Sequence, residues 1–224
     1  MIRQFFEKGF YKLTPQVRCD GRLAWAPILF LPTRDDTCIL RQATGGQFTP
    51  GQMDKNSFTP LSHPPLMTPF RLDVNTEAMA VRAKKRPVVL LAAERFPELW
   101  RLKSGTSHTR LRLQPHAGWL VIPVYDYDAD ADLQQLVEAL YFPQFFPLLG
   151  NNACPQYDSF ARLDRLQTVH ESLIELTDYC MGDDIMAMLR EAVVSYATGT
   201  EQGESYATLR GMFVEELRRQ NVVF

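Results

Sequence analysis

The amino-acid sequence predicts a mainly β domain with added helices, of the α+β class. Two compact apolar runs, residues 24–31 and 119–124, have the length and bounding residues of short buried strands. A third run, residues 87–91, is rich in valine and leucine. Near the C-terminus, residues 183–199 and 205–219 repeat apolar side chains at helical spacing. Short strands followed by helices are typical of an α+β fold.

The composition limits the size of the core and the kind of partner. The chain has 224 residues, of which 46% are hydrophobic and 22% are charged, enough for one main core with additions. Its formal net charge is -2, so the bulk charge argues neither for nor against nucleic acid. Binding to phosphates would therefore need a local basic surface.

The cysteines and the motif search exclude several classes of site. Cys19, Cys38, Cys154 and Cys180 lie far apart, without a CxxC motif or a Cys/His pair at metal-ligand spacing. We therefore expect reduced thiols, with no zinc site and no disulfide framework. The sequence has no signal-peptide pattern and no apolar run long enough to span a bilayer, which predicts a cytoplasmic protein without a membrane segment. Nucleotide, dinucleotide and metalloprotease motifs are absent as well, so no cofactor and no metal are expected.

Several further segments have weaker patterns. Residues 1–12 and 93–102 place apolar side chains at helical spacing, and each predicts a short helix. Residues 108–114 alternate leucine with arginine, as a strand does. Residues 132–140 predict a helix that is capped by Asp132. From Ser159 the sequence SFARLDRLQTV predicts two short strands.

Residues 33–68 show no sustained period of either strand or helix. The segment is rich in Thr, Pro, Gly, Gln and Asp. Such a composition predicts a long loop, and long loops within compact domains are usually functional or disordered. Disorder, or ordering by a partner, is the favoured interpretation over a catalytic role.

Four segments, in the same order, resemble parts of the PemK/MazF toxin family. They are AWAPILFLPTRD, KKRPVVLLA, WLVIPVY, and DSFARLDRLQTVHESLIEL with the helix-like DDIMAMLREAVVSYATG that follows. The resemblance covers about residues 24–198. It implies a small SH3-like β-barrel of the CcdB/MazF type with a closing C-terminal helix, which often forms a homodimer. The toxins of this family cut single-stranded RNA without a metal.

The same resemblance implies a division of the chain into three parts. Residues 1–23 would form an N-terminal helical extension, and residues 199–224 a C-terminal one. Residues 24–198 would form the barrel domain, with a long inserted loop at about 33–70. In the toxins the corresponding loop is much shorter, borders the RNA groove and is a place where antitoxins act. The insertion therefore favours a protein partner, an antitoxin or another protein.

Arg86 and Tyr125 occupy the two catalytic positions that the resemblance implies. Metal-free RNA cleavage needs a base, an acid and a cation for the charge of the phosphorane. Arg86 matches the arginine of the family's "RP" motif, and arginine suits the cation's role because its planar fork binds two phosphate oxygens. The second position is a Thr or Ser in the family, but Pro123-Val124-Tyr125 places Tyr125 there. The tyrosine hydroxyl lies farther from the backbone, which implies an altered or lost contact, although a tyrosine ring can stack on a base.

A basic surface beside these positions would guide single-stranded RNA. Its candidate residues are Lys84, Lys85, Arg110 and Arg112. His116 and His170 titrate near neutrality, but neither has a carboxylate partner in the sequence, and a surface or core role is favoured. For Arg162, Asp164 and Arg165 the favoured interpretation is a surface ion-pair cluster.

The sequence thus supports two hypotheses from different classes. The first is an RNA-directed, toxin-type protein that acts as a metal-free endoribonuclease in a toxin-antitoxin or phage-defence system. The second is a catalytically inactive module of the MazF fold, which binds a protein partner through its long loop and its terminal helices. The two hypotheses differ most at Tyr125. The first requires a catalytic site that has changed to use a tyrosine, and the second requires that catalysis at this position has been lost.

Overall fold

The structure is a computed structural model of the whole chain, and it describes residues 9–30, 37–42, 47–52, 79–93, 118–150, 158–200, 203–220 and 222. The chain forms two compact units. The smaller unit consists of residues 28–84, and the larger unit consists of residues 1–27 together with 85–224. Each unit is described separately below.

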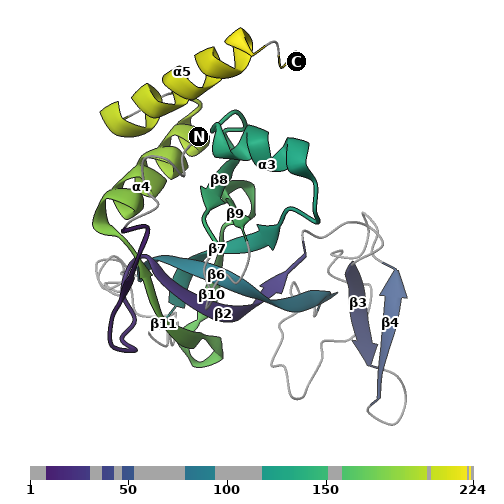
Figure 1. Cartoon of the computed structure of the whole chain (residues 1–224). Helices are drawn as coiled ribbons and strands as arrows, with labels where there is room; N and C mark the ends of the chain where they lie inside the picture. Colours follow the sequence, from purple (N-terminus) through teal and green to yellow (C-terminus); the bar gives the residue numbers. More distant parts are fainter. Residues whose placement is uncertain are drawn as a thin grey trace, which may run out of the picture. The chain divides into compact units, whose positions relative to one another are not determined.

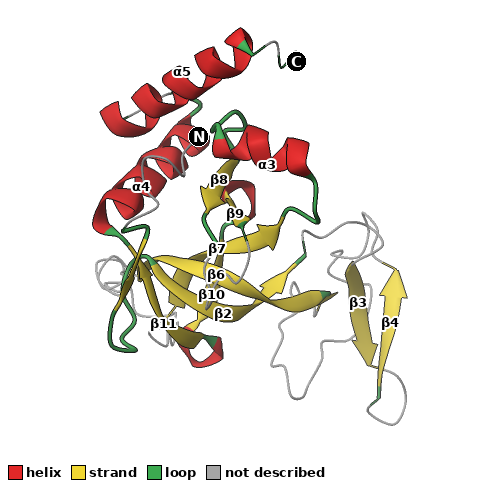
Figure 2. Ribbon diagram, in the orientation of Figure 1, coloured by secondary structure: helices red, strands yellow, loops and turns green. Residues whose placement is uncertain are grey.

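The larger unit contains an antiparallel sheet and three described α-helices, as Figure 2 shows. Its strands are β1 (Tyr11–Leu13), β2 (Arg22–Leu29), β6 (Ala83–Ala93), β7 (Gly118–Asp126), β8 (Phe145–Leu148), β9 (Ser159–Arg162), β10 (Gln167–His170) and β11 (Glu175–Met181), of which β2 and β6 continue into the smaller unit. Its helices are α3 (Ala131–Glu138), α4 (Asp183–Thr198) and α5 (Glu204–Arg219), with 3-10 turns η1 (Leu163–Arg165) and η2 (Glu171–Leu173). The expected α+β class is therefore confirmed.

The strands of this sheet follow the order β1-β11-β2-β6-β7-β9-β8. Strand β10 pairs with β7 beside β9, so β9, η1 and β10 together line one edge of β7. Among the described strands, β1 and β8 end the sheet and do not pair with each other. In the described residues the sheet is thus open rather than closed into a barrel.

The core of the larger unit lies between one face of this sheet and the helices. Figure 1 shows α3, α4 and α5 gathered on the same side of the sheet. Strand residues Val89 and Ile122 are fully buried there, together with Phe146 of β8 and Leu189 of α4. Leu217 of α5 belongs to the same cluster, so the C-terminal helix is part of this core.

Helix α4 follows directly from β11 and covers the sheet. Its buried residues Ile185, Met188, Leu189 and Ala192 lie at positions i, i+3, i+4 and i+7, which gives one apolar stripe. The helix ends at Gly199, whose φ of 69° lies in the left-handed region that favours glycine. The predicted helix 183–199 is thereby confirmed at both ends.

Arg22, at the start of β2, is a buried arginine with only 1% of its surface exposed. Its guanidinium donates to the carbonyl oxygens of Val17 (3.1 Å), Thr14 (3.3 Å) and Thr177 (2.9 Å), and also to that of Pro15. Burying an unsolvated charge is costly, and these carbonyl dipoles replace the water that the cation loses. The guanidinium consequently ties the segment before β2 to β11.

The smaller unit contains a three-stranded antiparallel sheet of β3 (Thr37–Gln42), β4 (Phe48–Gln52) and β5 (Met79–Val81). The long loop predicted over residues 33–68 is therefore wrong for residues 37–42 and 48–52. Ile39, fully buried, pairs with Gly51 on one side and Met79 on the other. Strand β4 is an edge strand, where Pro50 is tolerated because one side of the strand needs no ladder hydrogen bond. Because β4 is short and contains proline and glycine, its sequence lacks the alternation that predicts a strand.

Three local predictions need correction. Helix α3 is capped by Asp130, whose Oδ1 accepts a hydrogen bond from the Leu133 amide at 2.9 Å, whereas Asp132 lies in the first turn. The helix predicted over residues 1–12 is wrong at its end, because Tyr11 pairs with Met181 in β1. The helical apolar spacing over residues 205–219 includes Met212 in the predicted stripe, but Met212 is 53% exposed, because Tyr206, Phe213 and Leu217 define the buried face of α5.

Other predictions are confirmed or lie outside the described residues. Strands were predicted correctly at β2, β6, β7, β9 and β10, and helix α5 was predicted within one residue of its start. Residues 1–8, 94–102 and 108–114 lie outside the described residues. None of the helices within the described part of the chain combines the length and the apolar character needed to span a bilayer.

Replacing Arg22 by methionine should destabilise the protein strongly. The change keeps much of the side-chain volume but leaves buried carbonyls without donors, so we expect the free energy of unfolding to fall by about 3 kcal/mol or more. The free energy of unfolding of Arg22→Lys should lie between the values for wild type and Arg22→Met, because an ammonium cannot reach all four acceptors at once. Urea denaturation followed by circular dichroism measures both variants.

Arg18→Met is the matched control, since Arg18 is 39% exposed in its side chain and lies 3.8 Å from Glu171. Its free energy of unfolding should change by no more than about 0.5 kcal/mol. Equal losses in the Arg22 and Arg18 variants would contradict the assigned role of the buried guanidinium.

Candidate functional site

Strands β6 and β7 bring Arg86 and Tyr125 into contact. The two strands are antiparallel, with Val88 opposite Pro123, and continuing this register by two residues places Arg86 opposite Tyr125. The guanidinium carbon of Arg86 lies 4.2 Å from the centroid of the Tyr125 ring, which is a cation-π contact. Both residues are half-buried. The two positions chosen from the sequence as catalytic therefore lie side by side.

Further residues extend this contact across β9 and β8. Tyr125 is opposite Phe160 on β9, and their rings stack with centroids 6.1 Å apart. The guanidinium carbon of Arg162, also on β9, lies 5.4 Å from the Tyr125 ring centroid and 5.6 Å from that of Phe145 on β8. We call Arg86, Tyr125, Phe145, Phe160 and Arg162 the arginine-aromatic cluster.

The cluster lies on the face of β6 and β7 opposite to Val89 and Ile122, where its aromatic rings pack in a second apolar group with Leu133 and Val137 of α3. Successive residues of a strand point to opposite faces, so Val89 and Leu91 share one face while Arg86 lies on the other. Likewise Ile122 and Val124 belong to the main core, whereas Tyr125 packs against the second apolar group, which contains Phe160 and Val137. The strand pairing that builds the core therefore also fixes the backbone under the cluster.

Asp164, in the 3-10 turn η1, orients Arg162. Its two carboxylate oxygens accept from Nε at 3.0 Å and from Nη2 of Arg162, a bidentate pair, and Arg165 Nε lies 3.5 Å from the same carboxylate. The hydrogen bond from Arg162 to Asp164 raises the pKa of Arg162, against the opposing effect of burial. Arg162 therefore stays protonated, and its fork has a fixed direction.

Of the four residues predicted to form a basic RNA-guiding surface, only Lys85 lies in the described part of the larger unit. Lys85 is exposed, and its Nζ lies 2.6 Å from Glu175 Oε2 on β11. As the neighbour of Arg86 on β6, Lys85 points to the other face of the strand. Lys84 is exposed and belongs to the smaller unit. Arg110 and Arg112 lie outside the described residues.

Sequence reasoning missed Arg162 and Asp164. They were interpreted as a surface ion-pair cluster, and they do form an ion pair, but one that borders the Tyr125 ring. Their position depends on β9 pairing with β7, a contact between distant parts of the sequence. The pairing is signalled only by the strand pattern of SFAR and WLVIPVYD, which identifies the strands but not their partners.

The cluster has the chemistry to bind an anion beside a flat ring. Both guanidinium carbons lie within 5.4 Å of one phenol ring, and each guanidinium offers a planar set of donors that matches phosphate oxygens. The phenol hydroxyl is a further donor, and the aromatic faces can stack on a nucleobase. Oxygen anions and flat aromatic groups are thus its natural ligands.

His170 lies away from the arginine-aromatic cluster. His170 pairs with Gly118, at the opposite end of β7 from Tyr125, about 23 Å away along the strand. His116 lies outside the described residues. Within the described ranges, no three His, Cys, Asp or Glu side chains gather closely enough to hold a metal ion.

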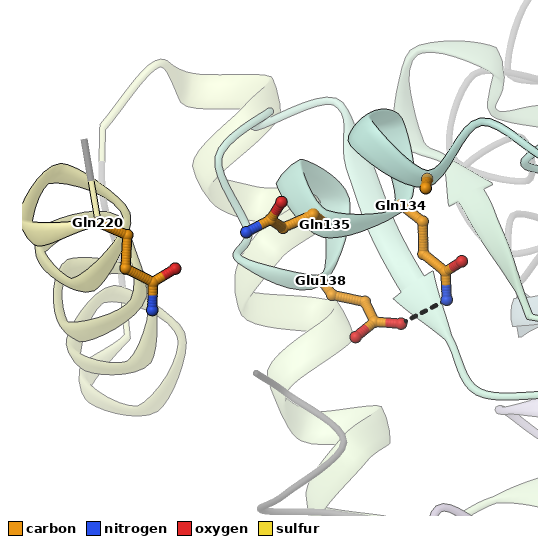
Figure 3. Close-up of a pocket in the computed structure, with 5 residues that line it drawn as sticks. Gln134, Gln135, Glu138 and Gln220 are labelled. Carbon is orange, nitrogen blue, oxygen red and sulfur yellow. Dashed lines mark hydrogen bonds between the residues drawn. The ribbon is translucent and has the colours of Figure 1, made fainter. Parts of the chain in front are cut away.

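A polar pocket of about 290 Å³ lies between α3 and the end of α5. Ala131, Gln134, Gln135, Glu138 and Gln220 line it, and the side chain of Gln134 donates a hydrogen bond of 2.9 Å to Glu138 within α3 (Figure 3). None of its five lining residues is basic or belongs to the arginine-aromatic cluster. The pocket therefore lacks the cations that a phosphate ligand needs.

Comparison with models of known protein families and with curated protein sequences gives no match for this chain.

Proposed function

We propose that the protein is a metal-independent endoribonuclease of the PemK/MazF type that acts on single-stranded RNA, and that the arginine-aromatic cluster is its active site. One observation supports the proposal above the others. The guanidinium of Arg86 lies 4.2 Å over the ring of Tyr125, and that of Arg162 lies 5.4 Å from the same ring. Two permanent cations beside one phenol suit the binding of a phosphodiester next to a stacked base.

The proposed reaction transfers the phosphorus from one ribose oxygen to another. The 2′-oxygen loses its proton and bonds to phosphorus, the bond from phosphorus to the 5′-oxygen breaks, and a proton is delivered to that oxygen. Arg86 and Arg162 stabilise the charge on the non-bridging oxygens of the phosphorane. The Tyr125 hydroxyl donates a hydrogen bond to the same group. The products are a 2′,3′-cyclic phosphate and a 5′-hydroxyl.

The order of the elements supports the family part of this proposal. Strand β6 contains the Arg-Pro pair, β7 contains Pro123-Val124-Tyr125, and η1 and β10, which follow β9, contain the LDRLQTV segment. Helix α4 then follows β11, as the closing helix of the family would. Under this proposal the chain has the SH3-like fold and the toxin-antitoxin or phage-defence role of that family.

Arg86→Ala should reduce RNA cleavage by about 100-fold or more, because the phosphorane loses a preorganised cation. Purified protein is incubated with a long single-stranded RNA in EDTA, and the fragments are separated on a gel and tested for cyclic phosphate ends. Wild-type protein should cleave in EDTA at an unchanged rate. Arg218→Ala is the matched control, since the side chain of Arg218 on α5 is 73% exposed. This substitution should leave the cleavage rate unaltered.

Intact RNA with folded wild-type protein, or equal cleavage by the Arg86 and Arg218 variants, would contradict the proposed reaction. RNA that is neither cut nor bound would instead favour the second hypothesis from the sequence, a catalytically inactive module that binds a protein partner. Tyr125 motivates this alternative, since it replaces the short hydroxyl residue of the family.

Tyr125→Phe separates the hydroxyl from the ring. The variant keeps the contact with Arg86 and the stacking on Phe160, so RNA binding should remain, while cleavage should fall about 10-fold or more through loss of one donor. Tyr125→Leu removes both features and should weaken binding as well. Binding is measured with an RNA whose 2′-oxygen at the cleavage site is removed. Full activity of Tyr125→Phe would show that the hydroxyl takes no part.

A further inference from the structure

Two thiols that are 161 residues apart in the sequence lie side by side in the larger unit. The Sγ atoms of Cys19 and Cys180 are 3.7 Å apart. Cys19 lies in the turn before β2, and Cys180 lies in β11, opposite Arg22. The sequence predicts reduced thiols, and both are free in the structure. Their spacing in the sequence does not indicate that they are neighbours.

Backbone hydrogen bonds hold the turn that contains Cys19 against the neighbouring strands. The Arg22 amide donates to the Cys19 carbonyl at 3.1 Å, and the Gly21 amide donates to the Leu90 carbonyl at 2.7 Å. On the other side, the Met181 amide donates to the Gly21 carbonyl at 2.9 Å. The backbones on both sides of the thiol pair are therefore held together, and a bond between the sulfurs needs an approach of only about 2 Å.

The two thiols have different surroundings. Cys180 is 2% exposed, and burial, followed by its contact with Cys19, raises its pKa to about 11. Cys19 is partly exposed, and its Sγ lies 3.8 Å from Nη2 of the permanently charged Arg22. An oxidant from solvent therefore reaches Cys19 first. Cys180 is shielded from solvent and is the neighbouring thiol that can react with an oxidised Cys19.

We propose that Cys19 and Cys180 are a peroxide-responsive pair that forms a reversible intramolecular disulfide. In the first step the Cys19 sulfur attacks hydrogen peroxide, its proton and one hydroxyl leave as water, and Cys19 becomes a sulfenic acid. In the second step the Cys180 sulfur bonds to that of Cys19, and the sulfenic hydroxyl leaves with the Cys180 proton as a second water. Two thiols and one peroxide thus give one disulfide and two waters. A dithiol reductant reverses the change.

The disulfide would bind the turn before β2 covalently to β11. A crosslink between such distant residues closes a long loop in the unfolded chain, which lowers the entropy of that state. The oxidised protein should consequently unfold at a higher temperature than the reduced protein. This inference stands independently of the proposed ribonuclease activity, because neither cysteine belongs to the arginine-aromatic cluster.

The test uses the full chain with Cys38→Ser and Cys154→Ser, which leaves only the proposed pair. The reduced protein is treated with hydrogen peroxide, and its intact mass, peptide map and thermal midpoint are recorded. We expect the loss of two hydrogen atoms, a peptide that joins Cys19 to Cys180, and a raised midpoint, all reversed by dithiothreitol. Adding Cys19→Ser to this background should prevent the mass loss and leave the single thiol of Cys180 slow to react.

Two results would overturn the proposal. One is stable oxidation of Cys19 to a sulfinic acid while Cys180 still reacts with iodoacetamide after unfolding. The other is a pair of unmodified thiols at peroxide concentrations that oxidise an exposed cysteine in a control variant, Ser205→Cys with Cys19→Ser. Circular dichroism of each variant establishes that a missing disulfide does not come from a lost fold.

Discussion

The arrangement around β2 depends on the burial of one positive charge. Arg22 is 1% exposed, and the hydrogen-bond acceptors found around it are backbone carbonyl oxygens and the sulfur of Cys19. A guanidinium has five donors in a fixed plane, so it can satisfy several chain segments at once, which an ammonium cannot. Because the acceptors come from both residues 14–19 and β11, this one side chain extends the link between the N-terminal segment and β11 beyond the ladder that β1 forms with β11. The proximity of Cys19 to Cys180 is a consequence of the same arrangement.

Strand alternation then separates the core from the candidate site. On β6 and β7, one set of alternate residues packs under the helices, and the other set includes Arg86 and Tyr125. A shift of one residue in the pairing of these strands would exchange the two faces and bury a guanidinium among apolar side chains. The stability of the core therefore also maintains the register that brings Arg86 to Tyr125.

Local patterns in the sequence predicted the parts of the fold that depend on local forces. Valine-rich and leucine-rich runs identified β6 and β7, and apolar spacing with Gly199 identified α4. The sheet of the smaller unit was missed because its cross-strand pairs join β3 to short segments that contain Pro50 and Gly51. Arg22 was not singled out, since a charged residue at the start of a strand normally lies in solvent.

Some residues of the candidate site could be identified from their own sequence segments, and others only from the pairing of distant strands. Arg86 and Tyr125 were chosen because their segments resemble motifs of the PemK/MazF family, and the antiparallel pairing of β6 with β7 gives the contact. Arg162 and Asp164 form a local ion pair that any surface turn could contain. Only the pairing of β9 with β7 gives that ion pair a neighbour such as Tyr125, and no spacing within the sequence records it.

Tyr125 is better understood as part of a packed group than as a longer substitute for a short hydroxyl residue. Its ring contacts Arg86 on one strand and stacks with Phe160 on another, and Phe160 in turn packs against Tyr127 and Phe145. A threonine at this position would leave the ring's space empty and both guanidinium groups without their shared aromatic face. The position of the arginines, and of any anion bound to them, would then change. The reach of one hydroxyl group therefore does not decide whether such a site is catalytic, because both arginines contact the same ring.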